Sequence, residues 1–247
     1  MVLDLLKNPE TRPLVRQVLV ATDLDDAIRA DLDQLLVEDI SAHMALPNVI
    51  KACSDTQTPQ GIVARVRLPV WDTEETISQT TNPLYLVLDG VSDPGNLGTL
   101  LRSSVAVGVS AVLLLPGSCD VWNPKAVRSS MGGSFLVPTF AASSWEEALD
   151  QLEEWKCEQV WAATMLEDDS GQVVSTAHYS VNWKDQAQAL VIGNEGNGLS
   201  QAVRDQLATK GGPVKAVHVP MQGSIESLNA AVCGSVIMFE YMRQAQS

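Results

Sequence analysis

The feature that most restricts the fold of this chain is a set of unbroken apolar runs after residue 83. Between and after these runs lie stretches with helical periodicity, at about 97–107, 123–131, 144–155, 199–208 and 225–243. The runs, rich in Val, Leu and Ile, are LYLVLDG (84–90), AVLLLPG (111–117), QVWAATM (159–165), ALVIG (189–193) and VKAVHVP (214–220). A strand that is apolar on both faces must be buried on both, as in parallel sheets covered by helices. The sequence therefore predicts an α/β domain with a mostly parallel sheet.

The first 70 residues have a different pattern. A strand-like run, VRQVLVA (15–21), is followed by an acidic helical segment (about 25–38) and a second strand, GIVARVRL (61–68). The next segment, 71–83, is polar, contains Pro83 and lacks periodicity. We therefore predict a small α/β domain over 1–70, a linker over 71–83 and the larger α/β domain over 84–247.

Composition limits the compartment and the partners. The chain is 45% hydrophobic, enough for a sizeable core, and has no apolar run long enough to span a membrane, so we expect a soluble protein. Its opening residues do not resemble a signal or transit peptide, and its four cysteines lack CxxC spacing, which is typical of reduced thiols in a cytosol-like compartment. Cytoplasm is the default, with an organelle as the alternative if an N-terminal extension is missing from this chain.

The net charge of −14 argues against a generally basic nucleic-acid surface. Any such surface must be a local cluster on an acidic body. The candidate pairs are Arg65 with Arg67, Lys125 with Arg128, and Lys210 with Lys215. For each pair alone, ordinary solvated charge is the competing interpretation.

Three glycine-containing loops follow predicted strands, where ligands bind in open parallel sheets. They are LDGVSDPGNLGTLLR (88–102), VIGNEGNGL (191–199) and VPMQGSIESLN (219–229). The usual GxGxxG and GxxxxGK[ST] patterns are absent. Together the loops indicate a site that holds a flat heterocyclic ligand through backbone hydrogen bonds and uses a few polar side chains for chemistry.

Each loop taken singly has a simpler explanation. The glycines are common in tight turns, Ser227 and Asn229 are common helix caps, and Arg102 is a candidate for an ion pair with Asp93 or Glu195. The three histidines lie outside the loops, and no His/Cys cluster or carboxylate pair is evident, so no metal site or Ser-His-Asp arrangement is expected. This combination favours group transfer from an activated donor.

The loop sequences DPGNLGTLLR, IGNEGNGLS and VPMQGSIESLNAAV, in this order and spacing, closely resemble the three motifs of the SpoU (TrmH-like) branch of SPOUT RNA methyltransferases. NPKAVRSSMGGSF (123–135) is similar to the segment between the first two motifs. The resemblance covers essentially all of 84–243. It implies a SPOUT-type domain with a deep trefoil knot, S-adenosylmethionine as cofactor, a homodimer, and methylation of a ribose 2′-hydroxyl in RNA, with rRNA favoured over tRNA.

The resemblance also implies roles for individual residues. Arg102 is the first catalytic candidate, and we favour a clamp on the RNA phosphate over a general base because guanidinium stays protonated. Of the other catalytic candidates, Asn96 would orient Arg102 or the ribose, and Glu195 would anchor the arginine or the loop. Ser227 and Asn229 would bond the cofactor or the substrate hydroxyl. The cofactor is expected near Gly193, Val219, Met221, Leu228, Leu115 and Gly117.

Two further segments extend the resemblance. TQTPQGIVARV (56–66) is similar to the end of the small RNA-binding domain that often precedes the catalytic domain, whereas MVLDLLKNPE (1–10) looks like a helix already under way. We therefore expect the opening strand of that domain to be absent. The small residues early in the last helix (228–244) permit close packing, and the family uses this helix at its dimer interface.

Two other functions stay open at this point. One is a catalytically silent RNA-binding paralogue that acts in ribosome assembly, which the acidic charge and the incomplete small domain favour. The other is an ordinary nucleotide-binding α/β domain, which would need a phosphate loop that the sequence lacks.

Overall fold

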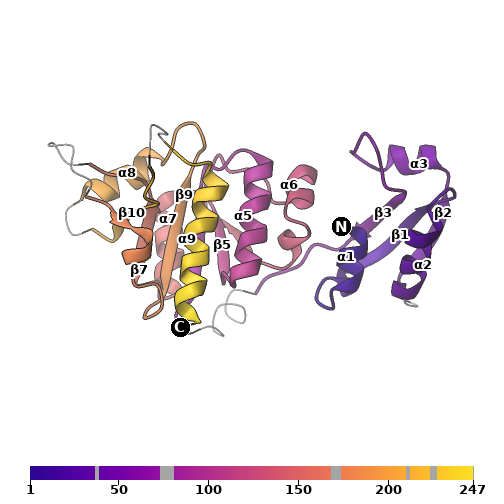
Figure 1. Ribbon diagram of the computed structural model, residues 1–247, viewed down its shortest axis with the longest axis horizontal. Coiled ribbons are helices and arrows are strands. Elements are labelled where there is room, and N and C mark those ends of the chain that lie inside the picture. Colours follow the sequence, from indigo (N-terminus) through magenta and orange to yellow (C-terminus); the bar gives the residue numbers. More distant parts are fainter. Residues whose placement is uncertain (37–38, 73–80, 168–173, 210–211, 223–226, 247) are drawn as a thin grey trace. The chain divides into compact units, whose positions relative to one another are not determined.

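The structure is a computed structural model that describes residues 1–36, 39–72, 81–167, 174–209, 212–222 and 227–246. The chain divides into two compact units, Met1–Val70 and Trp71–Ser247 (Figure 1). Most of the predicted linker, at 73–80, lies outside the described residues, so the linker stays a prediction. No helix in the described ranges is both long and apolar enough to cross a membrane.

The first unit is built on a three-stranded sheet in the order β2-β1-β3, in which β1 is parallel to β2 and antiparallel to β3. Its elements are α1 (Val2–Lys7), β1 (Val15–Ala21), α2 (Asp26–Leu35), β2 (Ser41–Ala45), α3 (Pro47–Ala52) and β3 (Ile62–Val66). The strand predicted at 15–21 is confirmed. Sequence analysis missed β2, because SAHMA has neither an apolar run nor a buried face to produce one. The expected absence of an opening strand stays a prediction.

The second unit contains a seven-stranded sheet in the order β6-β5-β4-β9-β7-β10-β8. Every pairing in it is parallel, so the predicted parallel α/β architecture is confirmed. The strands are β4 (Leu84–Asp89), β5 (Ala111–Leu114), β6 (Thr139–Ala141), β7 (Gln159–Ala163), β8 (Thr176–Ala177), β9 (Gln188–Gly193) and β10 (Val214–His218). Strands β6 and β8 were missed because each is too short to give a periodic signal.

Helices cover both faces of this sheet. They are α5 (Pro94–Val107), α6 (Pro124–Ser129), α7 (Trp145–Glu154), α8 (Gln201–Ala208) and α9 (Ala230–Ala245). One core cluster joins alternate residues of β4 and β9 to α5 and α9, and the other joins the intervening residues to α7 and α8. Figure 1 shows α5 and α9 side by side on one face. Burial on both sides explains why these strands are apolar without alternation.

Helices α5 and α9 approach closely because α9 carries a glycine at their contact. A Cβ at Gly234 would lie 2.6 Å from Leu100 Cδ2 of α5, closer than real contacts allow. At the next residue of α9, Ser235 Oγ lies 2.8 Å from Ser103 Oγ of α5, and the two hydroxyls are hydrogen-bonded. This packing fixes the start of α9 beside the start of α5, where the first and third loops lie.

Candidate functional site

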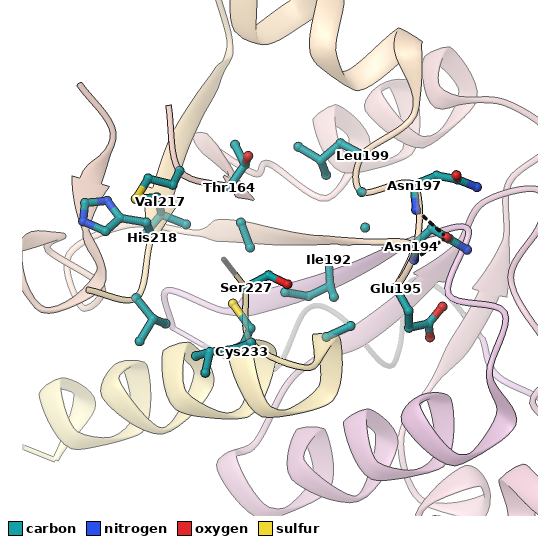
Figure 2. Close-up of a pocket in the computed structure, with 18 of the residues that line it drawn as sticks. Thr164, Ile192, Asn194, Glu195, Asn197, Leu199, Val217, His218, Ser227 and Cys233 are labelled. Atoms are coloured by element: carbon teal, nitrogen blue, oxygen red, sulfur yellow. Dashed lines mark hydrogen bonds between the residues drawn. The ribbon is translucent and has the colours of Figure 1, made fainter. Parts of the chain in front are cut away.

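The ends of β7, β9 and β10 and the start of α9 surround a cavity of about 460 Å³ (Figure 2). Figure 2 shows Asn194 and Glu195 on one side of it and Thr164 and His218 on the other, with Ser227 between. The second and third predicted loops therefore meet at one cavity, as their position after parallel strands requires. Residues 223–226 of the third loop lie outside the described part of the chain.

The second loop closes on itself as a small ring after β9. Asn194 N–H donates to Gly198 O at 2.8 Å, and Gly198 N–H donates to Asn194 O at 3.0 Å. A Cβ at Gly193 would lie 2.6 Å from the carbonyl carbon of Gly198, so only glycine lets the strand end pass this close to the ring. The ring forms one wall of the cavity.

Asn194 holds this ring to the first loop, and sequence analysis did not single it out. Its Oδ1 accepts the N–H groups of Gly196 and Asn197, both at 2.9 Å, while its Nδ2 donates to Gly90 O at 2.7 Å. An Asn after a glycine at a strand end is a frequent turn former, and that signal was available.

A chain of polar side chains connects all three loops. Asn96 Nδ2 donates to Glu195 Oε1 at 3.0 Å, and Asn229 Nδ2 donates to Asn96 Oδ1 at 2.9 Å. Asn229 Oδ1 in turn accepts the N–H groups of Ala231 and Val232 and caps α9. The structure thus brings together three of the predicted catalytic residues. The last helix begins at Ala230, later than the predicted 225, and Asn229 has the capping role that the simpler explanation gave it.

Glu195 anchors the first loop. It accepts hydrogen bonds from Asn96 Nδ2, from Asp93 N and from Ser92 Oγ. Partial burial acts to raise the pKa of the Glu195 carboxyl, but the hydrogen bonds from Asn96 and the neighbouring backbone outweigh it and hold this pKa below its usual range. The group is therefore a carboxylate at neutral pH.

Arg102 lies further along α5 and is exposed. Among the described residues it makes no hydrogen bond or ion pair, so the suggested pair with Asp93 or Glu195 is wrong: Asp93 Oδ2 pairs with Lys125 Nζ at 3.3 Å, and Glu195 with Asn96. No hydrogen bond joins Asn96 to Arg102 among the described residues, and the Asn96 amide bonds instead to Glu195 and Asn229.

The predicted cofactor residues divide into two groups. Gly193, Val219, Met221 and Leu228 line the cavity, together with Ser227. Leu115 and Gly117 instead line a separate hollow of about 380 Å³ at the ends of β5 and β6. The structure does not bring these two residues to the first cavity.

Thr164, His218 and Cys233 are among the side chains that line the cavity and that sequence analysis missed. His218 Nδ1 lies 2.9 Å from Ser175 Oγ, and burial raises the pKa of the Cys233 thiol. Thr164 and His218 lie at the ends of β7 and β10, so the rule that ligands bind beyond the carboxyl ends of strands could have identified them.

The basic candidates have different surroundings. Lys125 is paired with Asp93, Lys215 Nζ lies 5.6 Å from the centre of the Trp161 ring, and Lys210 falls outside the described residues. Arg128 lies in α6, and Arg65 and Arg67 lie in and just after β3 of the first unit. No group of three or more His, Cys, Asp or Glu residues in the described ranges could hold a metal ion.

Comparison with known proteins gives a family match over most of the second unit. The sequence model described as "SpoU rRNA Methylase family" matches residues 83–239. Among curated proteins, the chain is 31% identical over 235 residues to the 23S rRNA (guanosine(2553)-2'-O)-methyltransferase RlmP of Bacillus subtilis, covering 95% of this chain and 82% of that protein.

It is also 30% identical over 246 residues to the mouse protein "rRNA methyltransferase 3, mitochondrial", covering 84% of this chain but 58% of the mouse protein. The chain thus spans little more than half the length of the mitochondrial relatives. Among solved structures, the SpoU methyltransferase AviRb of Streptomyces viridochromogenes, in complex with AdoMet, is 28% identical with a TM-score of 0.75, covering 94% of this chain and 84% of that one.

Proposed function

The chain belongs to the SpoU rRNA methylase family, and from this premise we propose that it transfers a methyl group from S-adenosylmethionine to a ribose 2′-hydroxyl of rRNA. The observation that carries the proposal is the hydrogen-bonded chain Glu195–Asn96–Asn229. It joins the three family motifs at the rim of one cavity that Gly193, Val219, Met221 and Leu228 line. The rRNA target is favoured over tRNA because the curated relatives cited above are named as rRNA methyltransferases.

The cavity suits the cofactor in size and in chemistry. Its volume of about 460 Å³ lies within the usual range for small-ligand sites, roughly 300–1,000 Å³. Ile192, Leu199 and Leu228 supply apolar walls for an adenine ring, while Thr164 and Ser227 supply polar groups. When bound, the cofactor would supply a methyl group on a positively charged sulfur, so the protein needs no metal or nucleophile of its own.

In this mechanism the side chains of the chain position the RNA. Arg102, exposed and without a hydrogen bond or ion pair among the described residues, would bind an RNA phosphate through a bidentate contact and so place the ribose. Its positive charge would also stabilise negative charge that develops on the 2′-oxygen as the hydroxyl loses its proton. Glu195 and Asn229 would act as positioning residues, because they fix Asn96 and the first loop in place.

A homodimer through the second unit is part of the proposal. Val232, Val236 and Phe239 lie at helical spacing on α9 and are all exposed, with exposed fractions of 49%, 37% and 44%. A stripe of large apolar side chains in contact with solvent is typical of an interaction surface. The trefoil knot is likewise proposed from family membership, and the insertion of β9 between β4 and β7 supports it.

The structure contains no feature that indicates the cellular compartment. Relatives named for mitochondria and relatives from bacteria match at similar identity, so the cytoplasmic default stays a prediction.

Calorimetry with S-adenosylmethionine, followed by mapping of 2′-O-methyl sites on rRNA and tRNA with and without the protein, tests the function. Cofactor binding with a new methyl site on rRNA is the expected result. Absence of binding at millimolar cofactor would contradict the proposal. Tight cofactor binding without transfer to any RNA would favour the silent paralogue that acts in ribosome assembly.

A further inference from the structure

The hollow of about 380 Å³ at the carboxyl ends of β5 and β6 has no role in the proposed mechanism. Its size lies within the usual range for small-ligand sites, roughly 300–1,000 Å³. None of the described residues that line it also lines the cavity. Ligands bind beyond the carboxyl ends of strands in open parallel sheets, so the hollow is a separate candidate site at the same edge of the sheet as the cavity.

Gly90 of the first loop lies between the hollow and the cavity. A Cβ at Gly90 would lie 3.8 Å from the carbonyl oxygen of Pro116, which lines the hollow, and 3.8 Å from Cβ of Asn194, which lines the cavity. Gly90 N–H donates to Ser118 Oγ at 3.1 Å, and its carbonyl oxygen accepts from Asn194 Nδ2 at 2.7 Å. RNA that brings a ribose to the cavity therefore brings its neighbouring bases close to the hollow.

Two aromatic side chains, Trp122 and Phe140, form part of the wall of the hollow, and both are half-buried. Each ring is held by another aromatic ring. The ring centres of Trp122 and Phe135 are 5.2 Å apart, and those of Phe140 and Trp155 are 5.4 Å apart. A ring held in this way loses little conformational entropy when a ligand binds. Unpaired RNA bases stack on exposed aromatic surfaces of this kind.

Polar groups beside these rings are available to a ligand. Trp122 Nε1, Thr139 Oγ1 and Asp120 Oδ2 belong to residues that line the hollow and make no hydrogen bond or ion pair among the described residues. Asp120 Oδ1 accepts the N–H of Trp122 at 2.9 Å, which fixes the carboxylate beside the indole. A carboxylate accepts hydrogen bonds, and every RNA base carries at least one N–H donor on its Watson–Crick edge. The same negative charge disfavours a phosphate group at this place.

We propose that the hollow binds an unpaired base of the RNA substrate, which stacks on Trp122 and Phe140 and turns an N–H donor toward Asp120. This inference rests on the proposed function in so far as RNA is taken as the ligand. Recognition of the base and transfer of the methyl group then use adjacent but different surfaces, with Gly90 between them.

The test compares two fluorescein-labelled RNA strands on the full-length protein: a hexauridylate and a ribose-phosphate strand of the same length without bases. Fluorescence anisotropy gives both affinities, and their ratio reports the contribution of the bases. Trp122→Ala should lower the affinity for the hexauridylate by at least about fivefold, the smallest loss that removal of a stacking ring usually causes. Its affinity for the abasic strand should stay at the wild-type value.

Tyr179→Ala is the matched control, because Tyr179 is exposed and lines neither the hollow nor the cavity. It should leave both affinities unchanged. Since Trp122 packs against Phe135, thermal unfolding checks that the Trp122 variant is folded, and Trp122→Leu keeps an apolar side chain there without the ring. Equal losses in the Tyr179 and Trp122 variants, or a wild-type ratio in folded Trp122→Ala and Trp122→Leu, would overturn the proposal.

Asp120→Asn distinguishes a base from a phosphate in the hollow. The asparagine keeps an oxygen for the Trp122 N–H but loses the charge, and hydrogen bonds to a charged group are roughly twice as strong as neutral ones. The ratio of hexauridylate to abasic affinity should therefore fall. If both affinities rise and the ratio stays the same, the hollow accepts a phosphate and the proposal is wrong.

Calorimetry with S-adenosylmethionine separates this inference from the proposed function. If the Trp122 and Asp120 variants lower the affinity ratio while wild type binds no cofactor, the methyl-transfer proposal fails and the base site stands. If wild type binds cofactor and methylates rRNA while both variants keep the wild-type ratio, only the base site is wrong.

Discussion

The two units of this chain handle polar side chains in opposite ways. In the second unit, Asn96, Glu195 and Asn229 hold one another across three loops, and each has its hydrogen-bond partners within the protein. In the first unit, Arg16, Arg65 and Arg67 are exposed, and their guanidinium groups make no hydrogen bond or ion pair among the described residues. Groups held in place suit chemistry that needs alignment, whereas unpaired flexible cations suit attraction to a backbone.

The two units also differ in their balance of acidic and basic residues. Acidic residues outnumber basic ones by more than two to one in the second unit, while in the first the two kinds are nearer to balance. An acidic unit cannot attract RNA by its net charge, so under the proposed function the second unit would depend on single residues such as Arg102. The net charge of −14 averages over two units that differ in charge balance.

The largest expected effect comes from Arg102→Ala, which removes an exposed cation that makes no hydrogen bond or ion pair among the described residues. Methyl transfer should fall by at least about a hundredfold, the usual cost of losing one group that stabilises developing charge. Affinity for S-adenosylmethionine should stay nearly unchanged because Arg102 does not line the cavity. Transfer of a labelled methyl group and calorimetry measure the two quantities, with Lys184→Ala as the control. A fully active Arg102→Ala would refute the assigned role.

Gly193→Ala tests whether the second unit depends on a tightly closed loop. The added methyl group would lie 2.6 Å from the Gly198 carbonyl carbon, so the ring must open, at a cost of about 1–3 kcal/mol in the free energy of unfolding. Cofactor affinity should fall more than tenfold, roughly, as one wall of the cavity moves.

Gly196→Ala is the matched control for that change. Its added methyl group would meet only Asn194 Oδ1 at 3.6 Å, an ordinary contact, so stability and cofactor affinity should remain near wild type. Equal behaviour of the two glycine variants in thermal unfolding and calorimetry would mean that the ring does not shape the cavity.

Two substitutions at Asn229 distinguish its role as a helix cap from its role in aligning the loops. Asn229→Ala loses the cap of α9 and should reduce the free energy of unfolding by about 1 kcal/mol. Asn229→Asp keeps an oxygen for the cap but cannot donate to Asn96 Oδ1, so it should unfold like wild type yet transfer methyl groups more slowly. Denaturant unfolding and single-turnover rates check both. Wild-type activity in Asn229→Asp would reduce Asn229 to a cap alone.

The smallest effect concerns pH. Because hydrogen bonds hold the pKa of Glu195 below the ordinary value of 4.5, its carboxylate stabilises the folded state above that pH, and the contribution disappears as pH falls through the lowered pKa. The stability difference between wild type and Glu195→Gln should therefore be constant near neutrality and shrink in acid. Unfolding curves at a series of pH values measure it. Glu153→Gln, exposed on α7, is the control, and a difference that grows in acid would contradict the assigned hydrogen bonds.

Much of the second unit could be predicted because its apolar runs and its turn sequences indicate the same strands and loops. The apolar runs at 84–90 and 189–193 contain strands β4 and β9, which are buried at every residue except Gly193, and DPGN and GNEGNG are strong turn signals that follow them. The first unit was predicted less completely. Its strand β2 is exposed along nearly its whole length, so no hydrophobic pattern marks it. The register shift between Val15 and Gln17 in β1 also leaves no trace in the local pattern.

Within the site, the sequence identified the correct loops but not the partners inside them. Asn96, Glu195 and Asn229 were candidates as separate residues, and their mutual hydrogen bonds were not foreseen. The suggested pairing of Arg102 with Asp93 or Glu195 was wrong because Lys125 and Asn96 occupy those carboxylates. Competition among neighbours for a hydrogen bond depends on distances that spacing along the chain does not encode.

By itself, the sequence determined a parallel α/β sheet, the family and the loops that carry the chemistry. The sheet and the loops follow from hydrophobic burial and turn formation, which act over a few residues at a time, whereas the family was indicated by the resemblance of three loop motifs. Only the tertiary structure decided that Leu115 and Gly117 line a different hollow from Gly193, and that Asn229 reaches Asn96. Such contacts join residues distant in the chain, and strand order and register create them, which no local pattern specifies.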